Sequence, residues 1–430
     1  MNSLKNMRIL IVNTSERTGG AALAANRLKD ALNNNGEKAK MLVRDKQSDD
    51  ITVVGLPQSL RKQWNFLWER WTVFWRLHFL RKNLFQIDIA NIGTDITRLP
   101  EFKEADIIHL HWVNQGMLSL NNIRKILDSG KPVVWTMHDL WPASAICHVS
   151  LGCQNFKTQC RRCKYLPGHG SDNDLSVRVW QRKKAMLKGR HVWFVACSKW
   201  LAGEARQSGL LKGQSITHIP NTLDTRVFCK KDKGEARERL GLPAEGRLLL
   251  FVSQRVDNEN KGMSYLIEAC QQLHAQYPEM ARNTGIVVLG GHAEDLEEQL
   301  PWPVYALGYV SDTHRIVDAY NATDVFVLPS LSENLPNTIM EAMACGVPSI
   351  GFNVGGIPEE IDHRQNGYVA KYRDADDLAA GIRWVLDDAD HDALSRQAVR
   401  KVLTSYSQQS VALRYTEVYY EAMASKQFKL

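Results

Sequence analysis

The stretch from Asp324 to Phe352, DVFVLPSLSENLPNTIMEAMACGVPSIGF, contains two short apolar runs separated by a segment with helical spacing. The runs Asp324 to Pro329 and Val347 to Phe352 have the length and composition of buried strands. Between them, Pro336 disfavours helical geometry at the residue before it, so we expect the helix to begin near Asn337. A strand, a helix and a strand in this order predict a βαβ unit of a parallel sheet.

The same alternation continues along the chain in two sets, which predicts two doubly wound, Rossmann-like α/β domains. In such domains ligands bind at the carboxyl ends of the strands. The other expected strands are Arg8 to Asn13, Lys38 to Arg44, Ala105 to Trp112, Pro132 to His138 and Val192 to Ser198 in the first set, and Arg247 to Ser253, Gly285 to Leu289 and Val304 to Gly308 in the second.

The two sets meet at a turn-rich segment, Pro220 to Arg226, where we place the domain boundary. We expect a first domain over 1–222, with a cysteine-rich loop at 147–163, and a second domain over 223–405. The remaining segment, 406–430, keeps apolar residues at helical spacing but has no strand of its own. It is predicted to be a helix that packs back on the first domain.

The composition is that of a folded globular chain, with 44% hydrophobic and 23% charged residues among 430. The net charge of +7 favours anionic partners such as phosphates or an acidic membrane surface. No run approaches the roughly 18 apolar residues of a spanning helix, and the N-terminus lacks the pattern of a signal peptide. We therefore expect a cytoplasmic location, at the inner face of a membrane if the chain binds one, with reduced cysteines.

Two carboxylates in the opening stretch point to a binding site. Glu333 and Glu341 are eight residues apart and straddle the expected start of the helix. The first amides of a helix attract anions, and ionised carboxylates accept strong hydrogen bonds from sugar hydroxyl groups. This combination is typical of a pocket for a nucleotide sugar.

The stretch resembles the E-x7-E signature of family 4 of the retaining glycosyltransferases, enzymes with the two-domain GT-B fold. The resemblance covers nearly the whole chain. It extends to Thr18-Gly19-Gly20, His109-Leu110-His111, Thr136-Met137-His138-Asp139, Ile219-Pro220-Asn221, Arg255 with Lys261-Gly262, Leu307-Gly308-Tyr309 and Gly355-Gly356-Ile357-Pro358-Glu359.

The resemblance implies two domains that face each other across a cleft, and a retaining, metal-independent transfer of a sugar. The donor would be a nucleoside diphosphate sugar, and the acceptor a hydroxyl of a surface glycan, free or lipid-linked. Arg255 and Lys261 would hold the diphosphate, where fixed cations stabilise the charge of the leaving group. Glu333 would face the donor sugar and Glu341 the ribose. The donor site would further include Gly19, Gly20, Gly308, Tyr309, Val310, Asn334, Leu335 and Pro336.

Histidines follow or occupy two expected strands of the first domain. His138 lies at the carboxyl end of a strand, where the resemblance places a catalytic histidine near the reacting carbon of the donor. The alternative is a buried core histidine. His111 and Trp112 are expected to line the acceptor side, whereas His109 is expected to be buried. No cofactor is expected for catalysis.

Four cysteines, Cys147, Cys153, Cys160 and Cys163, have the spacing C-x5-C-x6-C-x2-C. Four thiolates suit a tetrahedral structural zinc ion, and reduced thiols or disulfides are the alternatives. The segment also resembles a cysteine-rich insert of transferases similar to the colanic-acid type. By contrast, the D-x-D of Asp172 to Asp174 sits in a polar loop and is interpreted as solvated.

The segment Ser59 to Lys82 carries tryptophans at helical spacing among basic residues. It predicts an amphipathic basic helix. Such a helix suits peripheral contact with an anionic membrane, but an aromatic stripe is also typical of a helix that packs on the sheet. The stripe comprises Trp64, Leu67, Trp68, Trp71, Phe74, Trp75 and His78, and the cations are Arg61, Lys62, Arg70, Arg76, Arg81 and Lys82.

Two other classes of protein were weighed against a transferase. A zinc-dependent nucleic-acid binding protein would account for the cysteines and the charge, but leaves the two glutamates unexplained. A Rossmann oxidoreductase lacks its G-x-G-x-x-G after the first strand. A non-catalytic nucleotide-binding protein stays open, as do the donor base and sugar, the acceptor and the oligomeric state.

Overall fold

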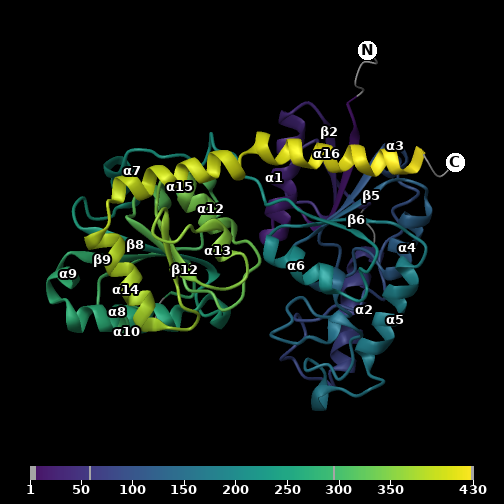
Figure 1. Cartoon of the computed structure of the whole chain (residues 1–430), viewed down its shortest axis with the longest axis horizontal. Helices are drawn as coiled ribbons and strands as arrows, with labels where there is room; N and C mark the ends of the chain where they lie inside the picture. The colour runs from purple at the N-terminus through teal and green to yellow at the C-terminus, as the bar shows by residue number, and fades with distance from the viewer. Residues whose placement is uncertain (1–5, 58–59, 294–295, 428–430) are drawn as a thin grey trace. The chain divides into compact units, whose positions relative to one another are not determined.

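The computed structural model describes residues 6–57, 60–293 and 296–427, with the side chains of 60–62, 281, 426 and 427 left aside. The chain forms two compact units (Figure 1). The first unit combines Met1–Thr222 with Gln408–Leu430, and the second comprises Leu223–Ser407. Each unit is built around one parallel sheet.

The sheet of the first unit has the order β3-β2-β1-β4-β5-β6-β7, and all of its neighbouring strands are parallel. The strands are β1 Arg8–Ser15, β2 Lys38–Asp45, β3 Val53–Gly55, β4 Ile107–Leu110, β5 Val133–Met137, β6 Trp193–Ala196 and β7 Ser215–His218. The helices are α1 Gly20–Asn34, α2 Leu60–Arg76, α3 Pro100–Glu104, α4 Leu120–Asp128, α5 Leu175–Leu187, α6 Lys199–Gln207 and α16 Gln408–Gln427.

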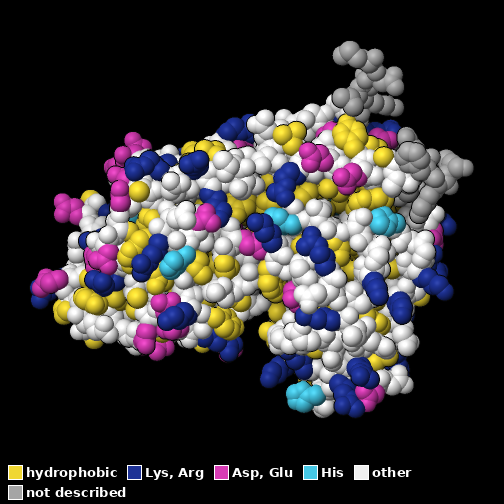
Figure 2. Space-filling view, viewed as in Figure 1, with side chains coloured by type: hydrophobic (Ala, Val, Ile, Leu, Met, Phe, Trp, Pro, Cys, Tyr) yellow, Lys and Arg dark blue, Asp and Glu magenta, His cyan; other side chains and the backbone are white. Residues whose placement is uncertain are grey.

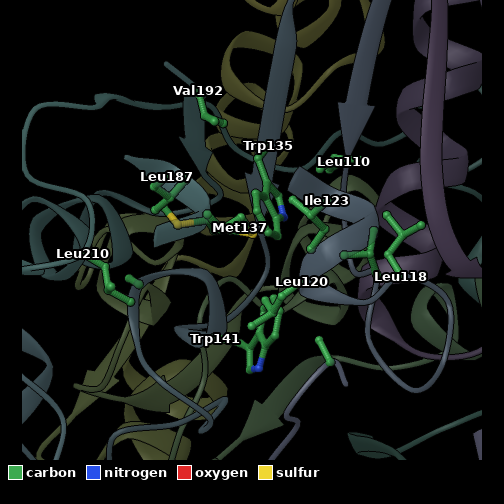
Figure 3. Packing of buried hydrophobic residues seen from close by; sticks show 14 of the residues in the cluster. Leu110, Leu118, Leu120, Ile123, Trp135, Met137, Trp141, Leu187, Val192 and Leu210 are labelled. Atoms are coloured by element: carbon green, nitrogen blue, oxygen red, sulfur yellow. The ribbon is translucent and has the colours of Figure 1, made fainter. Parts of the chain in front are cut away.

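Alternate residues of these strands enter two cores, one on each face of the sheet. In β1, Leu10 and Val12 belong to one cluster, whereas Ile9 and Ile11 belong to the other. The first cluster is the larger, and Trp135 of β5 lies within it (Figure 3). Both faces of the sheet are thus covered, as in other parallel sheets.

The C-terminal helix α16 packs on the first unit. Tyr415 and Tyr419 are buried in the same cluster as Ile9, Ile11 and the helix α1. The buried side chains follow helical spacing. This part of the predicted fold is confirmed, although Leu413, one of the apolar residues of the segment, is exposed.

The second unit has the sheet order β10-β9-β8-β11-β12-β13, again all parallel. Its strands are β8 Arg247–Arg255, β9 Thr284–Gly291, β10 Val304–Gly308, β11 Val325–Leu328, β12 Ser349–Phe352 and β13 Gly367–Ala370. Its helices are α7 Lys233–Leu240, α8 Met263–Gln276, α9 Pro278–Arg282, α10 Leu296–Gln299, α11 Thr313–Asn321, α12 Asn337–Ala344, α13 Ile357–Glu360, α14 Ala375–Arg383 and α15 His391–Ser405.

The prediction of two doubly wound α/β domains is confirmed by these two sheets. The expected βαβ unit is present as β11, α12 and β12, and α12 begins at Asn337 as predicted. One prediction needs correction. The tryptophan segment is helical only to Arg76, and its stripe is exposed instead of packed on the sheet, except for Phe74, which is half-buried. Ser59 and the side chains of Arg61 and Lys62 lie outside the described residues.

Candidate active site

The E-x7-E stretch of the second unit surrounds the start of α12. Pro336 is the N-cap residue and contributes no side-chain hydrogen bond to the first turn. Glu333 lies in the loop between β11 and this helix, and Glu341 lies within the helix. Leu335 is buried between them, whereas Asn334 is half-buried. The polar groups of the stretch therefore gather at the carboxyl edge of the sheet, where open α/β sheets bind ligands.

Strand β8 ends at the same edge with Arg255, and the loop after it carries Lys261. The Lys261 ammonium lies 2.5 Å from Glu333 Oε1. The Arg255 guanidinium is 65% exposed and pairs with Asp257, with Nη2 2.6 Å from Oδ2. Lys261 and Glu333 thus meet directly, while Arg255, at the end of β8, is held by Asp257 of the loop that follows.

Backbone contacts fix this loop against the E-x7-E loop. The Leu331 N–H donates to Asn260 O (2.8 Å), and Asn260 Nδ2 donates to Ser332 O (2.9 Å). Gly262 has φ +71°, and a Cβ there would lie 1.9 Å from Pro329 O. Only a glycine lets the two loops approach this closely.

A second glycine holds the position of Glu333. Gly355 has φ +57°, and a Cβ there would lie 1.7 Å from Glu333 O. The Gly-Gly-Ile-Pro-Glu segment identified in the sequence therefore packs its backbone directly on the carbonyl of the first glutamate. This contact gives the segment a physical role that spacing alone did not reveal.

Glu341 is buried, with 6% of its surface exposed. Tyr320 Oη donates a hydrogen bond of 2.8 Å to Glu341 Oε2. Tyr320 comes from α11 and was not predicted as a site residue. Its hydroxyl orients one carboxylate oxygen of Glu341.

The remaining donor-side candidates of the second unit follow β10. Gly308 ends this strand, Tyr309 is 68% exposed and Val310 is half-buried. They also lie at the carboxyl edge of the sheet. The strand that they follow, β10, is separated from β8 by β9 in the sheet.

Glu360 is a second residue that the sequence analysis missed. Its side chain is fully buried, and neither carboxyl oxygen makes a hydrogen bond among the described residues. Burial first, and the charge of Glu333 second, raise the pKa of Glu360 well above its usual range. Burial thus favours the protonated form of the Glu360 carboxyl group, which is close enough to Glu333 to be affected by its charge.

In the first unit, the candidate residues also follow strand ends. Gly19 and Gly20 form the start of α1, just after β1, with Gly19 as the N-cap residue. His138 follows β5 and is half-buried. His111 Nδ1 lies 2.9 Å from His138 Nε2, so the two rings share a hydrogen bond.

His111 does not present its ring to solvent, because it is only 3% exposed. Its contact with His138 makes it a residue that orients His138, and of the two acceptor-side candidates Trp112 is the more accessible. Trp112 Nε1 donates to Asp139 Oδ2 (3.0 Å). His109 is fully buried, as expected, with Nδ1 2.7 Å from Tyr419 Oη and Nε2 2.8 Å from Thr136 Oγ1.

These histidines are neutral at pH 7. Burial lowers the pKa of His138 to about 4, although Asp139 opposes the shift. Burial, reinforced by His138, lowers the pKa of His109 to about 3. The pKa of His111 lies well below its usual range for the same reason.

A buried ionic network extends from Asp139 to helix α2. His148 Nδ1 lies 2.7 Å from Asp139 Oδ2, and His148 Nε2 lies 2.6 Å from Asp88 Oδ2. Asp88 also pairs with Arg70 of α2. Burial lowers the pKa of His148, but the two carboxylates outweigh it and raise this pKa to about 10. The network joins residues far apart in sequence, and no local motif signals it.

The four cysteines of the predicted zinc site line one small cavity together with Phe156 and Tyr165. Burial raises the pKa of Cys160 and of Cys163 to about 12. Four thiols are a donor set that suits zinc. Within the described residues, however, no three His, Cys, Asp or Glu side chains are arranged as metal ligands. Zinc binding would require the thiols to draw closer together.

The D-x-D segment requires a correction. Asp172 is exposed and pairs with Arg162 at 2.5 Å, but Asp174 is not merely solvated. It is the N-cap residue of α5 and accepts hydrogen bonds from the N–H groups of Ser176 (2.9 Å) and Cys163 (2.9 Å). Its carboxylate stabilises the start of a helix and the end of the cysteine loop.

Among the described helices, none combines the length and apolar character that a membrane span requires.

Comparison with known proteins identifies the family. Residues 18–227 match the family model described as Glycosyltransferase Family 4, and residues 246–388 match that of Glycosyl transferases group 1. An uncharacterized glycosyltransferase of Methanocaldococcus jannaschii is 31% identical over 376 residues, which cover 80% of this chain and 92% of that protein. The chain belongs to glycosyltransferase family 4.

Other relatives match over a shorter range. The D-inositol 3-phosphate glycosyltransferase of Thermobispora bispora is 30% identical over 222 residues, 49% of this chain and 51% of that protein. The chain thus spans about half the length of the curated relatives of this kind that it matches. The crystal structure of Anabaena Alr3699/HepE in complex with UDP-glucose is 16% identical, covers 97% of this chain and 100% of that chain, and has a TM-score of 0.62. This likeness confirms the two-domain GT-B fold.

Proposed function

We propose that this protein is a retaining glycosyltransferase that moves a sugar from a nucleoside diphosphate sugar to a hydroxyl group of a glycan, free or lipid-linked. The observation that carries the proposal is the pair of Lys261 and Glu333, 2.5 Å apart at the start of α12. A cation, a carboxylate and a helix N-terminus at one sheet edge suit the phosphate and the hydroxyl groups of such a donor.

The cations have the role of stabilising the leaving group. Breaking the bond between the sugar and the diphosphate places negative charge on the diphosphate. The Arg255 guanidinium at the end of β8 and the Lys261 ammonium of the following loop supply positive charge to the diphosphate. The N-terminal dipole of α12 adds to this field. The proposal therefore requires no catalytic metal, and brief exposure to EDTA is expected to leave turnover unchanged.

Glu341 is assigned to the ribose of the donor. Tyr320 orients one of its oxygens, and a carboxylate can accept hydrogen bonds from both hydroxyl groups of a diol. Glu341→Gln is expected to weaken donor binding by about 1.5 to 3 kcal/mol, because the hydroxyl groups lose a charged acceptor. Tyr320→Phe is the matched control, because it removes only the orienting hydroxyl and should cost less.

His138 is assigned to the sugar side of the reaction. Because its pKa is about 4, it acts as a neutral hydrogen-bonding group at pH 7, oriented by His111. Glu333 is assigned to the hydroxyl groups of the transferred sugar. Retention of configuration rests on the resemblance of the E-x7-E segment to that of retaining enzymes.

Saturation-transfer NMR with UDP, GDP, ADP and NAD tests the proposal first. Binding of one of the three nucleoside diphosphates, lost in Glu341→Gln, is expected. NMR of the product from the matching nucleotide sugar then gives the anomeric configuration. Preferential binding of NAD, or an inverted product, would contradict the proposal.

A structural zinc ion held by Cys147, Cys153, Cys160 and Cys163 is also part of the proposal. Its support is that all four cysteines line one small cavity. Four cysteine ligands leave no coordination position for substrate, so this zinc would shape the loop and take no part in the transfer.

A further inference from the structure

Helix α2 turns its most apolar side chains toward solvent. Its outer side carries five large apolar residues that are each between 45% and 57% exposed: Trp64, Leu67, Trp68, Trp71 and Trp75. At about 100° per residue, all five fall within about 100° of the helix circumference. Phe79 and Leu80, in the turn after the helix, are 56% and 58% exposed. We call these seven residues the aromatic face.

The opposite side of the same helix is buried and combines polar residues with Val73, which is 0% exposed and belongs to the core of the first unit. Asn65, Glu69 and Arg70 are 1%, 0% and 6% exposed. An ordinary surface helix exposes its polar residues, whereas α2 buries these three and exposes its tryptophans. A helix of this kind needs a second apolar environment outside its own fold.

The buried contacts fix the rotation of α2. Glu69 accepts hydrogen bonds from the N–H groups of Ala90 (2.8 Å) and Gly116 (2.6 Å), and Arg70 pairs with Asp88. Rolling the aromatic face inward would break all of these contacts and remove Arg70 from the buried carboxylate of Asp88. The aromatic face is therefore a fixed feature of the folded first unit.

The turn after α2 extends the aromatic face. The Phe79 N–H donates to Phe74 O (2.9 Å), and the Phe79 ring lies 6.4 Å from the ring of Trp71 between centroids. His78 and Phe79 have φ of 52° and 64°. Such a conformation is unfavourable for these residue types and persists where contacts hold it. Here it places an exposed phenylalanine against an exposed tryptophan.

The charge around the aromatic face has one sign. Glu69 is the only acidic residue between Gln63 and Gln86, and it is buried. The exposed charges of the same segment are the cations of Arg76, Arg81 and Lys82. The Arg76 guanidinium stacks 4.7 Å above the ring of Trp75.

One further cation, Arg178, lies next to the aromatic face. Arg178 lines a hollow of about 450 Å³ beside Trp75, together with Arg76, His78 and one carboxylate, that of Asp174, which caps α5. Lys and Arg side chains gather over the lower part of the first unit, where α2 and α5 are labelled in Figure 1 (Figure 2). Tryptophan prefers the interface between water and lipid, and cations beside it favour anionic head groups.

We propose that the aromatic face is a membrane-docking surface, which seats the first unit on a bilayer that contains anionic lipid. A second copy of the chain fits less well. In a two-fold dimer the patch would meet itself, and the cations of Arg76, Arg81 and Lys82 would be brought near their own copies. A bilayer offers hydrocarbon to the tryptophans and negative charge to these cations at once.

Sedimentation with lipid vesicles tests the proposal without donor or acceptor, so its outcome is independent of the proposed transfer. The full chain is expected to bind vesicles of two parts phosphatidylcholine and one part phosphatidylglycerol, and to bind phosphatidylcholine alone more weakly. Molar salt should weaken the binding, because it screens the cations. Trp68→Ser with Trp71→Ser should reduce binding about tenfold or more, while the melting temperature stays unchanged.

The matched control is Trp200→Ser with Leu413→Ser, which removes exposed apolar side chains from α6 and α16 and should bind like the parent. Arg81→Glu with Lys82→Glu is a second variant, which should lose the preference for phosphatidylglycerol. Absence of binding by the parent, or equal binding by the tryptophan variant, would overturn the proposal. So would a parent dimer in light scattering that the tryptophan variant dissociates.

Discussion

Lys261 and Glu333 form an ion pair between the loops that follow β8 and β11, two neighbouring strands of the second sheet. Their atoms Nζ and Oε1 are 2.5 Å apart, and both side chains are mostly buried. A diphosphate that binds Lys261 competes with Glu333 for the same ammonium group. The pair therefore couples phosphate binding to the carboxylate assigned to the sugar.

Glu333→Gln separates the two roles of this pair. It removes the competitor for Lys261, so affinity for the nucleoside diphosphate alone should stay equal or rise. Turnover should fall by about 10² or more, because a contact to the reacting sugar is lost. Calorimetry of diphosphate binding and initial-rate kinetics measure the two effects.

Asp362→Asn is the control for this experiment. Asp362 is also a carboxylate 2.6 Å from a lysine, Lys401, in the same unit, but it lies outside the proposed site. The Asp362→Asn substitution should leave both the affinity for the nucleoside diphosphate and the turnover unchanged. Weaker diphosphate binding by Glu333→Gln together with parental turnover would contradict the assignment.

Arg255→Ala tests the second cation. Arg255 is exposed and held by Asp257, and the proposal requires it to act on the leaving diphosphate. Turnover should fall about 10²-fold in this variant, with little change in melting temperature. Arg226→Ala is closely matched, because Arg226 is 72% exposed and pairs with Asp224 two residues before it, at 2.8 Å. Equal kinetics in the two variants would remove Arg255 from the site.

Most of the fold could be predicted from the sequence because buried parallel strands are continuous apolar runs. The run Asp324 to Pro329 contains β11, and Pro336 placed the start of α12 correctly, since proline restricts the residue before it. The short strands β3 and β13 were not predicted. Each is an edge strand of three or four residues, too short to show a pattern of its own.

From the sequence, only those site residues that belong to local motifs could be predicted. The sequence placed Glu333 and Glu341 on either side of the start of α12, and the resemblance assigned Lys261 to the diphosphate; the structure brings Lys261 to Glu333. Tyr320 and Glu360 were missed, because their roles depend on contacts made by the fold and not on spacing.

The orientation of α2 could not be predicted for a related reason. Its periodicity showed an apolar stripe but not which side faces the sheet. Long-range partners decide this, since Glu69 finds its hydrogen bonds at Ala90 and Gly116. Once these contacts are known, the exposed position of the tryptophans follows.

The histidines of the first unit predict a loss of stability in acid. The pKa of His109 is about 3 and that of His138 about 4 in the folded state, against roughly 6.5 unfolded. At pH values between the folded-state and the unfolded-state pKa, the unfolded chain binds more protons than the folded protein. The free energy of unfolding should therefore decrease as pH drops from about 6.5 to 4. For a fully buried histidine the loss is on the order of 3 kcal/mol.

Denaturant unfolding at several pH values measures this slope. His109→Gln can hydrogen-bond but does not titrate, so the variant should be less stable at pH 7 and lose less on acidification. His169→Gln, at an exposed histidine, is the control. A parent protein whose stability is flat between pH 6.5 and 4 would show that these histidines can be protonated without cost.

The cysteine loop gives the last prediction. Protein purified without added metal should contain about one zinc per chain, and titration of the thiols with a mercurial should release it. Cys160→Ser with Cys163→Ser should lose the zinc and melt at a lower temperature, because binding energy at a structural site is folding energy for the segment it ties. Donor binding should change little, since the nucleotide site proposed here belongs to the second unit. Cys229→Ser, at a half-buried cysteine of that unit, should keep the zinc. Metal-free protein with the parental melting temperature would instead mean that the four cysteines are reduced thiols packed around an apolar cavity.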